Sequence, residues 1–388
     1  MRRQDLHYKI NNYPINNYSH KNHHYMPSLT KEQKIGQLFF IGIPGPEIDD
    51  RARELLYRVQ PGGVCLFSRN VRQREQTRRL LDDLRELSSI TPFLSVDQEG
   101  GLVDRLRRIM TPMPPPDQIR TADEAAEFGR IIADTLRVLG FNMNFAPVVD
   151  VVDSARERFS NGLHSRAFGR SKEEATEFAA AFINSMQSTG CLGCVKHFPG
   201  LGASEVDSHK ELPSVRVSED EFSGTDMFPY KELLAGDTVR SVMVAHAAFP
   251  NIGLQEEDQN GKLLPSSLSP AIITNLLRGE LKYDGLVLTD DLEMGAIVEN
   301  YGIGEACKMA IHAGVDMLAI CAGVDAINEG HAAILKAVNE KEISEERIDE
   351  SIARILSAKS FLEMPLPFDN ERLDSLSDEI AEFAGRLK

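Results

Sequence analysis

CLGCVKHFPGLG, at residues 191–202, is the stretch that most constrains the fold of this 388-residue chain. Its first five residues are mostly apolar, which predicts a short buried strand. Lys196 and His197 follow, and the Pro and Gly after them predict a loop. Asp207 and His209 come shortly afterwards. Ionisable side chains at the carboxyl end of a buried strand are typical of α/β proteins that carry a functional site at that end.

Short apolar runs alternate with longer amphipathic segments along most of the chain. Apolar residues recur at a spacing of three to four in the longer segments, which predicts helices between the strands. The predicted strands cover residues 37–42, 63–67, 92–96, 144–149, 193–196, 241–245, 285–289 and 316–320. The predicted helices cover residues 49–59, 73–87, 122–138, 173–188, 219–234, 270–280, 304–313 and 327–338.

Eight strand–helix units predict the α/β class and, within it, a single (β/α)8 TIM barrel. A doubly wound open sheet is the alternative, but no GxGxxG motif follows the first predicted strand. A further helix at residues 345–362 is expected to cover the barrel exterior, and the acidic end of the chain is expected to pack loosely. The predicted organisation is a disordered tail at 1–28, a barrel domain at 29–365 and a C-terminal helical tail at 366–388.

The composition disfavours some classes of binding partner and favours one cellular compartment. The formal net charge of −16 disfavours binding to nucleic acid or to anionic membrane surfaces. The polar N-terminal residues lack the apolar segment of a secretory signal, and no apolar run is long enough for a membrane span. The five scattered cysteines do not form a disulfide pattern, so we expect them to be buried in a cytoplasmic protein. A closed barrel has no edge strands, which favours a monomer.

Ionisable residues follow five of the predicted strands. Each of them alone could be a helix cap or a satisfied core residue. In a barrel, however, the carboxyl ends of all strands open into the same mouth, so the recurrence favours one shared site. The residues at these ends are Asp97, Asp150, Lys196 with His197, His246, and Asp290 with Asp291.

Two kinds of chemistry suit such a mouth. Histidines and carboxylates could hold a catalytic metal, but the sequence has neither HxH nor HExxH spacing. A sugar hydrolase instead needs a carboxylate, a proton donor for the leaving oxygen, and polar groups that bind hydroxyls. The side chains suited to binding hydroxyls are Asp97, Arg105, Arg166, Lys196 and His197.

Several motifs together resemble the family-3 glycoside hydrolases, and more narrowly the bacterial β-N-acetylhexosaminidases of the NagZ type. The resemblance covers about residues 30–360 in family order, with Leu201 standing where the family commonly has His. It implies a TIM barrel without metal or cofactor that hydrolyses terminal β-linked N-acetylglucosamine. The motifs are KHFPGLG at 196–202, DSHKELP at 207–213, VDQEGG at 96–101, FAPVVDV at 145–151, RAFG at 166–169 and TDDLEM at 289–294.

The resemblance also implies roles for individual residues. Asp290 matches the family nucleophile, which forms a covalent glycosyl-enzyme with retention of configuration. His209 matches the general acid/base and Asp207 its partner. The chemistry is sound, because imidazole titrates near 6.5 and a neighbouring carboxylate favours its protonated form. Asp97, Arg105, Arg166, Lys196 and His197 match the sugar-binding set. The implied substrate is a muropeptide fragment from cytoplasmic peptidoglycan recycling. A chito-oligosaccharide is the other carbohydrate substrate that we consider.

Besides the metal hydrolase, three alternatives remain open at this stage. The first is another family-3 specificity, such as β-glucosidase or β-xylosidase, although those enzymes typically take a glutamate acid/base from a second domain. The second is phosphorolysis of the glycosyl-enzyme, because a histidine tolerates an incoming phosphate better than a carboxylate does. The third is a catalytically silent barrel that binds glycans, which the presence of Asp290 and His209 disfavours.

Overall fold

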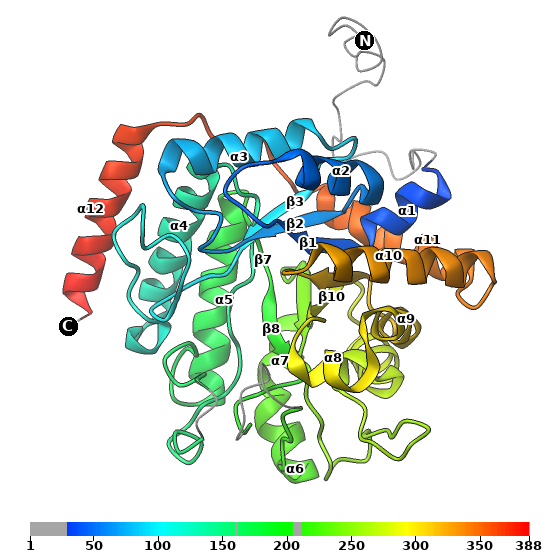
Figure 1. Cartoon of the computed structure of the whole chain (residues 1–388). Coiled ribbons are helices and arrows are strands. Elements are labelled where there is room, and N and C mark those ends of the chain that lie inside the picture. Colours follow the sequence, from blue (N-terminus) through cyan, green and yellow to red (C-terminus); the bar gives the residue numbers. More distant parts are fainter. Residues whose placement is uncertain (1–28, 160–161, 205–211, 388) are drawn as a thin grey trace, which may run out of the picture.

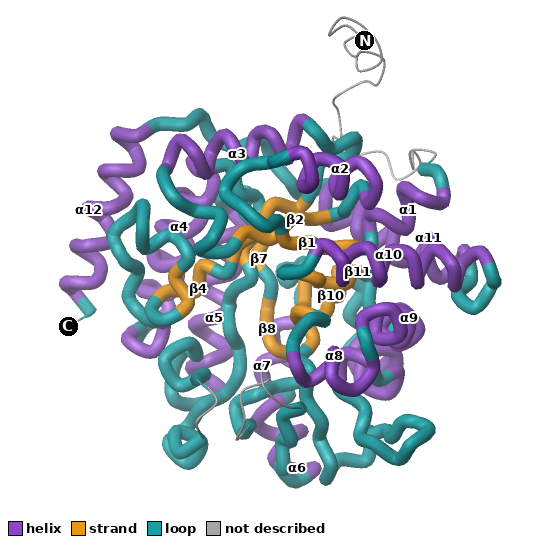
Figure 2. The backbone as a smooth tube through the Cα atoms, in the orientation of Figure 1, coloured by secondary structure: helices purple, strands orange, loops and turns teal. Residues whose placement is uncertain are grey.

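The computed structural model describes residues 29–159, 162–204 and 212–387. Strands occupy the centre of the molecule and helices surround them (Figures 1 and 2). The tail predicted at 1–28 lies outside the described residues. Within the described part of the chain, every helix is too short or too polar to cross a membrane. The five cysteines are buried and free, which confirms the packing role expected of them.

The central sheet has nine strands, and all of its pairings are parallel. Their order is β7-β6-β3-β2-β1-β11-β10-β9-β8. In chain order the strands are β1 (Phe39–Gly42), β2 (Gly63–Leu66), β3 (Phe93–Val96), β6 (Met143–Asn144), β7 (Leu192–Gly193), β8 (Val195–Phe198), β9 (Ser241–Val244), β10 (Leu286–Asp291) and β11 (Met317–Ile320). A separate antiparallel hairpin joins β4 (Gln98–Gly100) and β5 (Val103–Asp104).

The two ends of the sheet meet in one short segment of chain. β7 pairs with β6, β8 pairs with β9, and only Cys194 separates β7 from β8. The sheet is therefore a nearly closed, barrel-like structure, which confirms the predicted α/β class. The single strand predicted at 193–196 is wrong in one respect. It is divided in two at Cys194, because each half pairs with a different neighbour.

The strand predicted at 144–149 is also too long, since β6 ends at Asn144. Proline has no N–H to donate to a ladder, and Pro147 lies in the middle of the predicted run. The segment still follows the neighbouring chain. Cys194 N donates to Ala146 O at 2.8 Å, and Val149 N donates to Lys196 O at 2.7 Å. These bonds bring the residue after the segment, Asp150, beside β8.

The helices that cover the sheet begin at local capping signals. Thr30 and Thr121 form capping boxes, and the Ser171 hydroxyl accepts from Glu174 N. The larger helices are α2 (Asp50–Val59), α3 (Arg74–Glu86), α4 (Ala122–Leu139), α5 (Lys172–Ser188), α9 (Ile303–Ala313), α10 (Val324–Asn339), α11 (Glu345–Lys359) and α12 (Asn370–Arg386). Shorter ones are α1 (Lys31–Gln37), α6 (Glu219–Glu221), α7 (Phe228–Leu234) and α8 (Gly295–Tyr301).

Several predicted helix boundaries are wrong. α1 includes Gln37, which was assigned to the first strand, and both α1 and α8 were missed. The helix predicted at 219–234 is interrupted by a π-helical segment, η2 (Phe222–Asp226), between α6 and α7. The segment predicted at 270–280 is likewise π-helical, η4 (Ala271–Glu280). In η2 and η4 each N–H bonds to the carbonyl five residues earlier instead of four. The spacing of apolar residues changes too little for this difference to be visible in the sequence.

The core follows the alternation of side chains along the strands. On β1, Phe39 packs against His331 of α10, with 5.6 Å between ring centroids. The next residue, Phe40, contacts Phe93 and Phe145 at centroid distances of 6.2 and 5.0 Å. The four phenylalanines are nearly or fully buried, so the interior and the helical layer are both packed against this strand.

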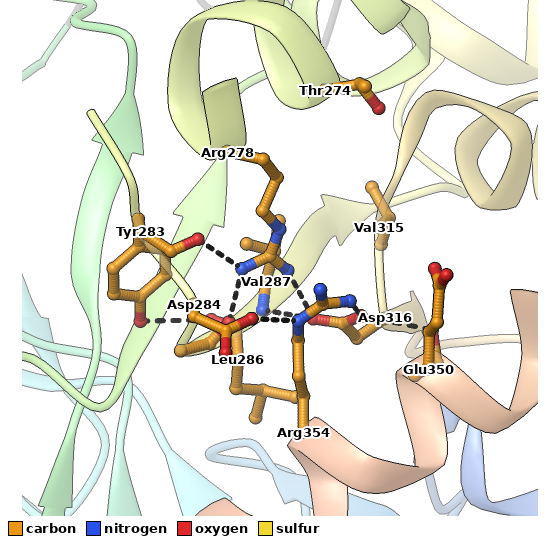
Figure 3. Close-up of polar contacts among 12 residues, drawn as sticks. Thr274, Arg278, Tyr283, Asp284, Leu286, Val287, Val315, Asp316, Glu350 and Arg354 are labelled. Atoms are coloured by element: carbon orange, nitrogen blue, oxygen red, sulfur yellow. Dashed lines mark hydrogen bonds and ion pairs between the residues drawn. The ribbon is translucent and has the colours of Figure 1, made fainter. Parts of the chain in front are cut away.

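The amino ends of β10 and β11 are tied to α11 by a buried carboxylate (Figure 3). Asp316, which is 0% exposed, accepts from Arg278 Nη2 at 2.6 Å and from Val287 N at 3.0 Å through Oδ2. Its Oδ1 accepts from Ser351 Oγ at 3.0 Å, and Arg354 Nη1 lies 3.4 Å away. The carboxylate is saturated by these donors, so we interpret the cluster as structural.

The expectation that the acidic end of the chain packs loosely is wrong. α12 lies along α4 on one side of the molecule (Figure 1) and buries Leu373, Leu376 and Phe383. The Phe383 ring is 5.9 Å from the Phe128 ring of α4. The apolar residues of α12 recur every three to four positions among many acidic ones. The acidic composition of α12 therefore suggested loose packing although one face of the helix is apolar and buried.

Replacement of Phe383 by alanine should lower the free energy of unfolding by about 3 kcal/mol, because it leaves a cavity against α4. Denaturant unfolding would measure the change. Met364→Ala is the matched control, since Met364 is 71% exposed and its loss should change stability by less than about 0.5 kcal/mol. Equal, small effects of the two substitutions would contradict the packing role of α12.

Candidate active site

The carboxyl ends of the parallel strands bring the predicted polar residues together. Asp97 follows β3, Lys196 and His197 lie in β8, and Asp290 lies near the end of β10. The pairing register places Val96 opposite Asn144 of β6, and Thr289 opposite Val244 of β9. Asp97, Asp290 and the end of β8 therefore leave the sheet at the same edge of the barrel.

Arg105 reaches this edge from the β4–β5 hairpin. Asp104 fixes the hairpin by accepting from Gln98 Nε2 at 2.8 Å and from Met113 N at 2.9 Å. The Gln98 amide oxygen in turn accepts from Arg105 N at 3.0 Å. Arg105 Nη2 lies 3.8 Å from Asp97 Oδ2, while its Nε is buried and has no hydrogen-bond partner in the described structure. The hairpin therefore holds a guanidinium donor beside Asp97.

A chain of buried charges connects β3, β8 and the loop that precedes α5. Lys196 Nζ lies 2.7 Å from Asp97 Oδ1 and 2.6 Å from Glu99 Oε1. Arg166 binds Glu99 with both ends of its guanidinium, at 2.7 Å from Nε and 2.9 Å from Nη2. Burial would lower the pKa of Lys196, but Asp97 and Glu99 raise it above its ordinary value. Lys196 is therefore a charged donor at neutral pH.

His197 is oriented by Asp150. The imidazole Nδ1 lies 2.7 Å from Asp150 Oδ2, and Leu201 N donates to Asp150 Oδ1 at 2.6 Å. Asp150 thus holds both the ring and the turn that follows β8. The contact from position 201 comes from the backbone, so the replacement of the usual histidine by leucine leaves this hydrogen bond in place. The Leu201 side chain itself is only 7% exposed.

Asp290 lies near the end of β10 and interacts electrostatically with His197 and Lys196. Burial alone would raise the pKa of its carboxyl group, but the neighbouring His197, together with Lys196 and the hydrogen bond from Asp291 N, lowers the pKa below its ordinary value. That hydrogen bond, from Asp291 N to Asp290 Oδ1, measures 2.8 Å. The carboxylate is therefore ionised at neutral pH, which is the state that a nucleophile requires.

His246 supports the end of β10 as a neutral ring. Burial lowers the pKa of His246, which favours the uncharged form. Its Nε2 lies 3.1 Å from the carbonyl oxygen of Asp291, which can only accept, and its Nδ1 lies 2.7 Å from Ser267 Oγ. These partners assign the proton to Nε2, so the ring donates to Asp291 and accepts from Ser267.

The structure therefore assembles most of the predicted site. Asp290 interacts electrostatically with His197 and Lys196. Lys196 contacts Asp97 and Glu99, which connect it to the other predicted binding residues. Asp207 and His209 lie outside the described residues. The residue that sequence reasoning missed is Glu99, whose signal was its position in VDQEGG directly after a buried strand. Its role could not be read there, because its partners are 67 and 97 residues away.

A cavity of about 470 Å³ lies elsewhere in the barrel. Its lining includes Leu192 at the start of β7 and Arg240 just before β9, together with residues 360–363 after α11. It therefore opens at the amino ends of the strands and contains none of the predicted site residues. In the described part of the chain, no three His, Cys, Asp or Glu side chains are grouped as a metal would require.

The fold and the charge cluster fit a barrel enzyme that binds a polyhydroxylated ligand. Comparison with known families is more specific, because the glycosyl hydrolase family 3 N-terminal domain matches residues 30–358. The chain therefore belongs to this family, as its motifs predicted.

Named relatives agree with this membership. The chain is 33% identical to a β-hexosaminidase of Tolumonas auensis over 298 residues, which are 75% of this chain and 85% of the relative. It is 35% identical to a β-hexosaminidase of Pseudomonas aeruginosa over 291 residues, or 72% and 81% of the two chains. The solved family-3 β-N-acetylglucosaminidase of Paenibacillus sp. is 34% identical, with a TM-score of 0.82 over 92% of this chain and 69% of that one. The predicted class, a glycoside hydrolase of the hexosaminidase type, is confirmed.

Asp291, beside the predicted nucleophile, should make stability depend on pH. Burial, together with the charges of Glu293 and Asp290, raises the pKa of Asp291 to about 7. An unfolded aspartate titrates near 3.9, so between about pH 4 and 7 the folded chain binds more protons than the unfolded one. The contribution of Asp291 to stability therefore falls as the pH rises through this window.

Asp291→Asn should accordingly raise the unfolding midpoint at pH 8, and the gain should shrink as the pH falls toward 4. Asparagine keeps the side-chain oxygen that accepts from Glu293 N and Cys321 N, so these two hydrogen bonds can persist. Thermal unfolding of both proteins between pH 4 and 8 would measure the difference. A gain of equal size at every pH, or a loss at pH 8, would contradict the assignment.

Proposed function

We propose that this protein is a retaining exo-β-N-acetylglucosaminidase that hydrolyses terminal β-linked N-acetylglucosamine. Family membership and the names of the relatives support the reaction class. The observation that carries the proposal furthest is the position of Asp290 near the end of β10, at the same edge of the barrel as Asp97 and Lys196, with its pKa held below the ordinary value. A glycosidase needs such an anion beneath a developing oxocarbenium ion.

In the first step, Asp290 attacks the anomeric carbon and forms a glycosyl ester while the bond from that carbon to the aglycone oxygen breaks. His209 gives its proton to the departing oxygen, and Asp207 favours the protonated ring. In the second step, water attacks the same carbon and loses a proton to His209, and the Asp290 carboxylate leaves. The sugar is released with the configuration that it had in the substrate.

The proposed binding residues offer the groups that a sugar requires. Asp97 accepts hydrogen bonds from ring hydroxyls, while the cationic side chains donate to hydroxyl oxygens. Two of the three N–H bonds of the Lys196 ammonium suffice for Asp97 and Glu99, which leaves one for a ligand. The Arg105 guanidinium, whose Nη2 lies 3.8 Å from Asp97 Oδ2, provides further donors. His197 completes the set, held in place by Asp150.

The first test is release of p-nitrophenol from its β-N-acetylglucosaminide and from its β-glucoside. We expect a strong preference for the acetamido sugar, and Asp290→Ala should reduce kcat/KM by about 10³- to 10⁵-fold. Asp284→Ala is a matched control, because its side chain is 86% exposed just before the same strand and its loss should leave activity unchanged. Equal use of the glucoside would indicate a different family-3 specificity, and inactive wild-type protein would oppose the proposal.

The acid role of His209 has its own signature. His209→Ala should slow hydrolysis by about 10²- to 10⁴-fold, the usual contribution of proton transfer. The loss should be larger for an alkyl or sugar aglycone than for p-nitrophenol, which departs readily without a proton. NMR of the first-formed product should show the β anomer. Equal losses for both kinds of leaving group, or an α product, would contradict this mechanism.

We also propose muropeptide fragments with an anhydro-muramic acid aglycone as the natural substrate, on the strength of the sequence motifs. Release of N-acetylglucosamine from purified muropeptide, followed by mass spectrometry, tests this directly. Cytoplasmic location and a monomeric state stay predictions from sequence. Fractionation of cells and light scattering of the purified protein would measure them.

A further inference from the structure

The side chain of Glu99 is surrounded by two of the proposed sugar-binding cations. It is 2% exposed, and its Oε1 lies 2.6 Å from Lys196 Nζ and 2.9 Å from Arg166 Nη2. Its Oε2 lies 2.7 Å from Arg166 Nε. Both oxygens are occupied by these two cations. Glu99 is therefore poorly placed to contact a substrate itself.

Arg166 depends on this carboxylate for its position. It lies in an irregular stretch between β6 and α5, where the described residues form turns but no helix or strand. Its backbone N donates to Leu163 O, but among the described residues Glu99 is the partner that binds its side chain. A long, flexible side chain on a loop has many rotamers, and a bidentate ion pair selects one of them.

Lys196 is held from two sides. Asp97 and Glu99 lie at 2.7 and 2.6 Å from its ammonium, and the Lys196 side chain is only 3% exposed. Loss of Glu99 would leave the ammonium with one carboxylate and would leave the Arg166 guanidinium unpaired. An unpaired buried charge is strongly unfavourable, so both cations would move or attract water.

We propose that Glu99 is a positioning residue that sets the Arg166 guanidinium and the Lys196 ammonium at a fixed separation for sugar binding. The inference rests on the proposed function, because it assigns the two cations to the sugar. Glu99 acts through them and takes no part in bond making. Its carboxylate accepts at both oxygens, which an amide cannot do. In Glu99→Gln, an NH₂ group must face an N–H of Arg166 or Lys196.

Glu99→Gln should lower kcat/KM for the N-acetylglucosaminide by about 100-fold, with a raised KM, because misplacement of binding groups by about 1 Å has effects of that size. The loss should be shared with the partner, so Arg166→Ala combined with Glu99→Gln should cost less than the product of the two single effects. The variant should also lose activity at a lower alkaline pH than wild type, since Lys196 has lost one of its two anions.

Asp316→Asn is the matched control. Asp316 is an equally buried carboxylate that binds Arg278 and Arg354 (Figure 3). It precedes β11 and so lies at the amino ends of the strands, opposite the proposed site. Its replacement should lower the unfolding midpoint and leave kcat, KM and the pH profile of the folded protein unchanged. This contrast separates a positioning role in Glu99 from a general loss of stability.

Wild-type kinetics and pH profile in folded Glu99→Gln would overturn the inference while leaving the proposed function intact. Inactive wild-type protein would instead contradict the proposed function. Should Glu99→Gln fail to fold, Glu99→Asp provides a second test. It keeps the charge, but its shorter side chain cannot reach both cations at these distances, so unchanged KM in that variant would equally overturn the inference.

Discussion

Closure of the parallel sheet is the constraint on which the rest of the molecule depends. An open sheet would leave unpaired N–H and C=O groups along two edges, and burial of such groups is unfavourable. Here both edges end in the segment 192–198, where β7 pairs with β6 and β8 pairs with β9. The change of partner occurs at Cys194, whose N–H is not lost but donates to Ala146 O at 2.8 Å.

The proposed site is built on this closing segment. β8 contributes Lys196 and His197, and its hydrogen bonds with residues 147–149 bring Asp150 alongside. Backbone pairing therefore sets the positions of Lys196, His197 and Asp150, whereas Arg166 lies on a loop and is held by Glu99. This matters for a glycosidase, because groups that stabilise a developing charge act best when they are already in place.

The ionisable side chains of the site are paired with one another. Lys196 lies between Asp97 and Glu99, Arg166 is bound by Glu99, and His197 by Asp150. Pairing offsets the loss of hydration that each group undergoes on burial. The arrangement at the other end of the barrel, around Asp316, uses the same chemistry to connect the amino ends of β10 and β11 to α11.

The sequence by itself determined the α/β class, the approximate strands and helices, and the family, because these depend on local periodicity and on contiguous motifs such as KHFPGLG. It also identified Asp97, Arg105, Arg166, Lys196, His197 and Asp290 as candidates. Only the tertiary structure decided that the fifth strand divides at Cys194, that α12 packs against α4, and that Glu99 joins two cations. The reason is physical: each of these depends on partners far away in the chain, whereas periodicity reports only on neighbours.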